Sequence, residues 1–241
     1  MNIKQKKHKI LLSFLKICNK SKIDNDLFSN IASDCDIKAA EIALIFENGI
    51  TDIIDLYLSN NVDKLKSKIA DSNDFDSKKI REKIYFCVFN FFELQKDNRQ
   101  AVAAIKNFYF DLGNLVDKDN GLEPISYAVK SAYQLADKIW HILQDKSTDY
   151  NYYTKRLVLA KILSKAFFKF VGDDSKDLEA TAQVISVEID RVMQFEKFKK
   201  DFSNIAEISK EELSNMLMDS NKKMKPINEI VKNLPFIRLF N

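Results

Sequence analysis

The sequence predicts an all-α protein. Only 4 glycines and 3 prolines occur among the 241 residues, too few for the many turns that a β-sandwich or β-barrel requires. Apolar residues recur instead at the three- and four-residue spacing of amphipathic helices. With 46% hydrophobic and 30% charged residues, the chain is long enough and apolar enough to bury a sizeable core in a soluble protein.

The N-terminal quarter is expected to form three short helices followed by a long one. Capping residues and the pair Asn48-Gly49, a favourable left-handed stop, mark the boundaries. This order is the outline of a helix-turn-helix head on a helical body, although many all-α proteins begin in the same way. The four expected helices cover residues 8–20, 25–35, 37–49 and 51–69.

The body is expected to contain five helices, two of which are almost wholly apolar. A phenylalanine-rich run leaves little polar face on the first, which Ser77 can cap. The fourth carries a single stripe of three lysines and is otherwise apolar, so it must be central or must face both a core and a partner. Asp173, Asp174 and Ser175 can cap the fifth. The five ranges are 75–95, 99–113, 124–144, 154–172 and 176–200.

The C-terminal part begins with a short polar helix at 209–220, and a lysine cluster then precedes an apolar stripe. Bases beside an apolar face are typical of helices that adsorb to anionic membranes, although the same face could dock on the chain's own body. The expected membrane contacts are Lys222, Lys223, Lys225, Ile227, Ile230, Val231, Leu234 and Phe236. We divide the chain into a head (1–72), a body (73–203) and this tail (204–241).

Charge is unevenly distributed, although the net charge is only +3. Residues 1–22 carry seven lysines and no acid, whereas residues 24–60 carry eight acids and one base, Lys38. Affinity for duplex DNA comes largely from neutralising phosphates, so an acidic head opposes it. We expect no nucleic-acid partner, and DNA binding through the N-terminal helices is kept as the alternative function.

The sequence offers little for catalysis or metal binding. Its two histidines lack the Glu-x-x-His pairing of a di-iron helix bundle, and no phosphate-binding glycine loop or nucleophile elbow occurs. The three cysteines are widely spaced, which predicts reduced, buried thiols in a cytosolic compartment. No signal peptide or membrane-spanning stretch is recognisable. We therefore expect no enzyme, no cofactor and no metal.

The stretch DKSTDYNYYTKR, residues 145–156, differs from its surroundings in composition. It crowds tyrosines ahead of Lys155 and Arg156 at the start of an apolar helix, where acids would suit the helix dipole better. This pattern favours a contact with a partner protein or a lipid headgroup.

An internal arrangement of the same stretch is the alternative interpretation. In it, Tyr152 and Tyr153 half-bury against two isoleucines of the preceding helix, Ile139 and Ile142. Arg156 then pairs with one of two nearby acids, Asp149 or Asp145. The two interpretations do not exclude each other.

This stretch, with GDDSKDLEAT (172–181) and EIDRVMQFEKFK (188–199), resembles the C-terminal region of the ubiquinone (coenzyme Q) biosynthesis accessory family known as coenzyme Q nine. The likeness extends over roughly 76–200, where KIREKIYFCV and NRQAVAAIKNF are also similar. Two positions depart from the family pattern. Tyr152 stands where the family has Trp, and Gln183 stands where an aromatic is common.

The resemblance implies a TetR-like fold that has lost DNA regulation, in a homodimeric protein without enzymatic activity. Such a protein holds an isoprenoid lipid or quinone precursor in its body and presents it to the demethoxyubiquinone hydroxylase at a membrane surface. We accordingly expect a cytoplasmic protein, peripheral on the inner membrane of a bacterium. A plain scaffold for a membrane complex, without a cavity, is a third possibility.

The resemblance assigns residues 151–156 to the docking surface, and the apolar pattern supplies the other candidate residues. The hydroxylase-docking surface comprises Ile139, Ile142, Asn151, Tyr152, Tyr153, Thr154, Lys155 and Arg156. Candidates for the lipid cavity are Phe89, Phe92, Trp140, Leu163, Phe167 and Phe168. The dimer is expected to form through the helices at 154–171 and 177–199, the second with the stripe Leu178, Thr181, Ile185, Ile189, Val192 and Phe195.

Overall fold

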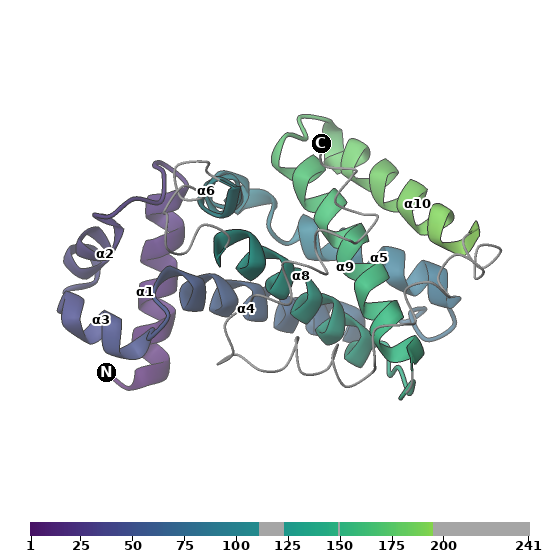
Figure 1. Cartoon of the computed structure of the whole chain (residues 1–241), viewed down its shortest axis with the longest axis horizontal. Coiled ribbons are helices and arrows are strands. Elements are labelled where there is room, and N and C mark those ends of the chain that lie inside the picture. The colour runs from purple at the N-terminus through teal and green to yellow at the C-terminus, as the bar shows by residue number, and fades with distance from the viewer. Residues whose placement is uncertain (111–122, 149, 195–241) are drawn as a thin grey trace.

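A computed structural model describes residues 1–110, 123–148 and 150–194 of the chain (Figure 1). Every regular element in these residues is helical, which confirms the all-α prediction. The α-helices are α1 (Ile3–Cys18), α2 (Leu27–Cys35), α3 (Ala39–Ile45), α4 (Ile50–Ala70), α5 (Ile80–Glu93), α6 (Arg99–Phe110), α8 (Glu123–Ile142), α9 (Tyr150–Val171) and α10 (Glu179–Gln194). Short 3-10 turns precede α6 and α10, namely η1 (Lys96–Asn98) and η2 (Lys176–Leu178).

The helices form an elongated molecule with the N-terminal helices at one end. Figure 1 shows α1, α2 and α3 gathered there, while α4 runs from them into the rest of the molecule alongside α8. At the other end α9 packs between α8 and α10, and α10 also packs on α5. The expected tail helices lie outside the described residues.

Local hydrogen bonding explains where two helices begin. α1 starts at residue 3 rather than 8, because the Asn2 side chain accepts from the Gln5 N–H while the Gln5 side chain accepts from the Asn2 N–H, a capping box. The expected cap at Ser77 is wrong. Glu82 instead accepts from the Lys79 N–H at 2.9 Å, and the Ser77 hydroxyl donates to the Asp74 carbonyl.

Hydrogen bonds of the Asn19 side chain connect the end of α1 to the start of α6. It follows the last residue of α1, and its Oδ1 accepts from the Ala101 N–H at 2.9 Å, so it caps the start of α6. Its Nδ2 donates to Asn98 Oδ1 at 3.1 Å. One continuous apolar core, from Ile10 in α1 to Ile189 in α10, joins both parts. All three cysteines are free and buried, as predicted.

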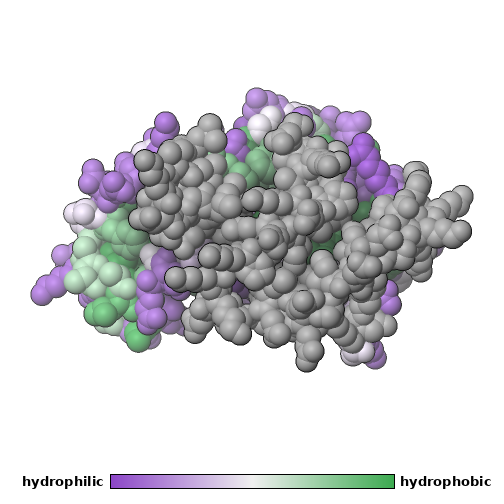
Figure 2. Space-filling model, viewed as in Figure 1, coloured by the Kyte–Doolittle hydropathy of each residue, from purple (hydrophilic) through white to green (hydrophobic). Residues whose placement is uncertain are grey.

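The exposed face of α3 is apolar and acidic. Leu44 is 78% exposed, and Figure 2 shows apolar surface gathered over the end of the molecule formed by α2 and α3. The acid of this helix, Glu41, forms an ion pair with Lys6 of α1. α3 itself contains no Lys or Arg, and Lys38 directly precedes it as its N-cap residue.

Candidate functional site

The turn between α8 and α9 brings the unusual stretch back toward the helix before it. Gln144 adopts a left-handed conformation with φ of 56°, and its N–H donates to the His141 carbonyl. The Asp145 N–H donates to the Trp140 carbonyl at 3.0 Å. Together these bonds form a Schellman motif, which ends α8 and turns the chain sharply. The Asp145 side chain is thereby placed beside the first turns of α9.

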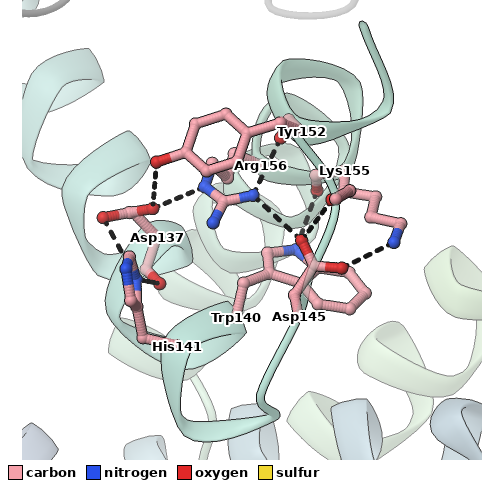
Figure 3. Close-up of polar contacts among 8 residues, drawn as sticks. Asp137, Trp140, His141, Asp145, Tyr152, Lys155 and Arg156 are labelled. Carbon is pink, nitrogen blue, oxygen red and sulfur yellow. Dashed lines mark hydrogen bonds and ion pairs between the residues drawn. The ribbon is translucent and has the colours of Figure 1, made fainter. Parts of the chain in front are cut away.

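Arg156 lies at the centre of this joint and is only 1% exposed. Its guanidinium binds Asp137 of α8 through Nε and Asp145 of the turn through Nη1, the latter at 3.2 Å (Figure 3). Nη1 also donates to the Tyr152 carbonyl at 3.0 Å. The guanidinium carbon lies 3.3 Å from the centre of the Tyr152 ring, and the Tyr152 hydroxyl donates to Asp137 at 3.1 Å. We call Asp137, Asp145, Tyr152 and Arg156 the arginine cluster.

Lys155 and Trp140 extend the arginine cluster on one side. Lys155 Nζ lies 2.6 Å from Asp145 Oδ1 and 5.3 Å from the centre of the Trp140 ring. Trp140 Nε1 in turn donates to the Lys155 carbonyl at 3.1 Å. Burial disfavours the charged form of Asp145, but hydrogen bonds from its neighbours, Lys155 foremost, outweigh it and lower the pKa of this carboxyl to about 2.

The predicted docking residues differ in their exposure to solvent. Ile139 and Arg156 are buried, so neither side chain is available to a partner in this conformation. Asn151 is exposed, whereas the others are half-buried, namely Ile142, Tyr152, Tyr153, Thr154 and Lys155. Tyr153 packs edge-on against Tyr152, with ring centres 5.1 Å apart.

The pairing of Arg156 with Asp145 agrees with the internal arrangement considered above. Asp149 lies outside the described residues. The sequence argument missed Asp137, because its pairing with Arg156 joins two helices and has no signature in local spacing. The cations at the start of α9 therefore have acidic partners inside the chain, which offset their unfavourable position in the helix dipole.

An apolar cavity of about 200 Å³ lies between five helices. Its walls come from α4, α5, α6, α8 and α9. Four of the six predicted cavity residues lie on these walls, namely Phe92, Leu163, Phe167 and Phe168. A cavity of roughly 150 Å³ with such a lining stays dry and binds benzene in another protein, so this volume suits about one ring with a short substituent.

Two predicted cavity residues lie elsewhere, which corrects their assignment. Trp140 packs with Lys155 beside the arginine cluster, because its indole N–H finds a carbonyl partner there. Phe89 stacks on Tyr85, one turn before it in α5, with ring centres 5.9 Å apart. The phenylalanine-rich pattern identified the right helices but did not tell which face borders the cavity.

The predicted dimer stripe on α10 also needs correction. Leu178, Thr181, Ile185 and Ile189 are buried within the chain itself, since α10 packs on α9 and α5. Val192 is half-buried against the same core, and Phe195 lies outside the described residues. A regular apolar stripe predicts a covered face but not what covers it. This face is closed to a second copy, and a dimer contact would need another surface.

The start of α10 is held by a second buried carboxylate. Asp173 is 1% exposed, and its Oδ2 accepts from both the N–H and the hydroxyl of Thr181, at 2.7 and 2.5 Å. Its Oδ1 accepts from the Ser175 N–H at 3.0 Å and from the Ser175 hydroxyl. Burial opposes ionisation, but these hydrogen bonds outweigh it and lower the pKa of Asp173 to about 2. Of the three predicted capping residues, Asp173 and Ser175 accept N–H groups at the start of α10, whereas Asp174 pairs with Arg99.

The described residues contain neither a membrane-spanning helix nor a metal-binding cluster. None of these helices is long and apolar enough to cross a membrane. In the same residues no group of three or more His, Cys, Asp or Glu side chains could hold a metal ion. The predicted membrane contacts, residues 222–236, lie outside the described part of the chain.

The segment that contains the arginine cluster and the α8 and α9 walls of the cavity is similar to known proteins. Residues 125–196 match the COQ9 family model. The chain is 30% identical over 79 residues to the probable mitochondrial ubiquinone biosynthesis protein coq9 of Dictyostelium discoideum, a match of 33% of this chain and 26% of that protein. It is 33% identical over 73 residues to the mitochondrial ubiquinone biosynthesis protein COQ9 of Rattus norvegicus, covering 30% of this chain and 23% of the relative.

The human ubiquinone biosynthesis protein COQ9 is 30% identical over 73 residues, with the same coverage. The chain thus spans about a quarter of the length of the curated relatives that it matches. The family match is shorter than the span of 76–200 predicted above, and it includes the arginine cluster, the α8 and α9 walls of the cavity and Asp173. Residues 125–196 of this chain therefore belong to the COQ9 family of ubiquinone biosynthesis proteins.

Proposed function

We propose that this chain is a non-enzymatic accessory protein of ubiquinone biosynthesis that binds an isoprenoid quinone precursor in the cavity between α4, α5, α6, α8 and α9. The observation that carries the proposal is this apolar cavity, two of whose walls belong to the COQ9-family segment. An apolar cavity gains affinity from an apolar ligand by removing it from water. Its lining includes Phe92, Leu163 and Phe167.

The volume limits what can be bound. About 200 Å³ suits a ring and the first part of an isoprenoid tail, so the remainder of a long tail must leave the cavity or the helices must separate to admit it. Short-tailed quinones are therefore the appropriate ligands for a first test.

Presentation to the demethoxyubiquinone hydroxylase is the second part of the proposal. The arginine cluster fixes the start of α9, and next to it Asn151 is exposed and Tyr153 half-buried. Aromatic side chains are frequent anchors of protein interfaces, and burial of their neighbours holds them in place. The buried Arg156 would contribute by positioning this surface and not by touching the hydroxylase.

The membrane part of the proposal concerns the tail. Its lysines, Lys222, Lys223 and Lys225, would attract an anionic membrane by roughly 1 kcal/mol each, enough for reversible binding. The protein would thus lie on the surface of a membrane, the cytoplasmic face of the inner membrane in a bacterium.

Mass spectrometry of lipid extracted from the purified chain tests the carrier role. We expect an isoprenoid quinone or its precursor, or its uptake after exposure to a short-tailed quinone. Ala132→Phe fills the cavity and should prevent this, whereas Ala160→Phe, also half-buried but off the cavity wall, should not. Recovery of no apolar molecule from the unmodified chain under either condition would refute the carrier role.

Hydroxylase docking needs a separate test. Tyr152 is unsuitable for substitution, because its ring and hydroxyl belong to the arginine cluster. Tyr153→Lys should weaken hydroxylase binding in a pull-down, and Leu44→Lys, on exposed α3, is the matched control. Equal binding by both variants and the unmodified chain would show that docking uses another surface.

A further inference from the structure

Two tyrosine hydroxyls beside the cavity lack a partner. Tyr57 of α4 and Tyr109 of α6 both line it and are 4% and 5% exposed. Within the described part of the chain, no group meets either hydroxyl in hydrogen-bond geometry. Polar groups lie near both, Asn61 beside Tyr57 and Ser131, Asp55 and Tyr127 around Tyr109, but none of them forms a hydrogen bond of normal geometry with the tyrosine hydroxyl.

The other polar side chains of the lining are satisfied by the chain itself. Gln95 Nε2 donates to the Phe91 carbonyl at 2.8 Å, and the Ser164 hydroxyl donates to the Ala160 carbonyl at 2.8 Å. Ser131 is directed to Asp55 Oδ1, at 3.4 Å. Tyr57 and Tyr109 are thus the exceptions, because the other polar side chains of the lining form hydrogen bonds within the chain.

An unpaired hydroxyl in such a place is costly. Leaving a buried polar group without a partner costs about 1–3 kcal/mol, and native proteins pair the large majority of these groups. Burial raises the pKa of Tyr109 to about 12 and also raises that of Tyr57, so both hydroxyls keep their protons. Both hydroxyls can therefore act as hydrogen-bond donors.

We propose that Tyr57 and Tyr109 select the ligand, by donating hydrogen bonds to a carbonyl or ether oxygen on a ring bound in the cavity. This inference rests on the proposed carrier function, because it concerns the same cavity. A pure hydrocarbon of the same size would leave both hydroxyls unpaired, whereas an oxygenated ring satisfies them. The cavity thereby discriminates by the ring's oxygen atoms, and its phenylalanines contribute affinity without this selectivity.

The experiment compares two ligands of similar size on four proteins. The ligands are a benzoquinone bearing one prenyl group and prenylbenzene, its hydrocarbon counterpart. The proteins are the unmodified chain, Tyr57→Phe, Tyr109→Phe and the control Tyr133→Phe. Tyr133 of α8 is also buried with an unpaired hydroxyl, but it does not line the cavity. Dissociation constants are measured by calorimetry, and thermal melting verifies that each variant is folded.

We expect the unmodified chain to bind the quinone more tightly than prenylbenzene. Tyr57→Phe and Tyr109→Phe should each weaken quinone binding about threefold to tenfold, the usual worth of one hydrogen bond, and leave prenylbenzene binding unchanged. Tyr133→Phe should change neither. Binding of both ligands with no effect of the two cavity substitutions would overturn the selection by tyrosines and leave the carrier role standing. Binding of neither ligand by the unmodified chain would refute the carrier role itself.

Discussion

Each end of α9 is fixed by one buried aspartate, and the two ends use opposite kinds of partner. At the start of the helix Asp145 is held by two cations, Arg156 and Lys155. Beyond its end Asp173 is held by neutral donors, the N–H groups and hydroxyls of Ser175 and Thr181. Both arrangements lower the pKa of the aspartate to about 2. Similar pKa values therefore arise from different physical causes.

The two ends of α9 are therefore expected to respond differently when a charged side chain is removed. Removing the buried cation Arg156 from the first end leaves Asp137 and Asp145 without their shared positive charge, and breaking a buried ion pair in this way is strongly destabilising. Removing the aspartate from the second end leaves only neutral donors unpaired and one helix uncapped. The first end also forms the support of the proposed docking surface, whereas the second connects α9 to α10 inside the core.

The largest effect is expected from Arg156→Met. It keeps much of the side-chain volume but leaves Asp137 and Asp145 without their shared cation, so the free energy of unfolding should fall by about 3–5 kcal/mol in urea denaturation. Lys155→Met is the control, because Lys155 is 40% exposed and should cost about 1 kcal/mol or less. Equal losses from the two substitutions would mean that burial of Arg156 has no special weight.

The sequence predicted the helical class and most helices because these depend on local signals. Spacing of apolar residues, caps such as Asp173 and the turn at Gly49 are all properties of neighbouring residues. The observed helix boundaries differ from the predicted ones where a capping residue lies outside the apolar pattern, as Asn2 does at the start of α1.

The sites were predicted less well, because they depend on which helices meet. Four of the six predicted residues line the cavity, whereas Trp140 and Phe89 contact other neighbours. The pairing of Asp137 with Arg156 crosses between helices, and the tyrosines of the cavity come from α4 and α6, outside the family match. Periodicity identifies a buried face, whereas only tertiary packing shows what that face contacts.

A smaller effect is expected from Asp173→Ala. The substitution removes the acceptor of four hydrogen bonds and the cap of α10, so we expect a loss of about 2–3 kcal/mol in the free energy of unfolding. Asp174→Ala removes the adjacent, 91% exposed carboxylate that pairs with Arg99, and it should cost about 0.5 kcal/mol. A loss at Asp173 no greater than at Asp174 would show that the cap contributes little.

The smallest effect, and the clearest difference between the two ends of α9, is expected in how the free energy of unfolding depends on acid pH. Both aspartates have a folded-state pKa of about 2, below the usual 3.8, so each stabilises the fold fully above about pH 4. That contribution is lost as the pH falls toward about 2, and we expect about 1–2 kcal/mol from each.

Added salt distinguishes the physical causes of the lowered pKa values of Asp145 and Asp173. In an Asp173→Asn background the remaining acid dependence from Asp145 should shrink when NaCl rises from about 0.05 to about 0.5 M, because added ions screen its attraction to Lys155 and Arg156. In an Asp145→Asn background the part from Asp173 should stay, because its partners are uncharged. Urea denaturation at several pH values measures both. The same salt response in the two backgrounds would show that charge pairing does not set the two ends of α9 apart.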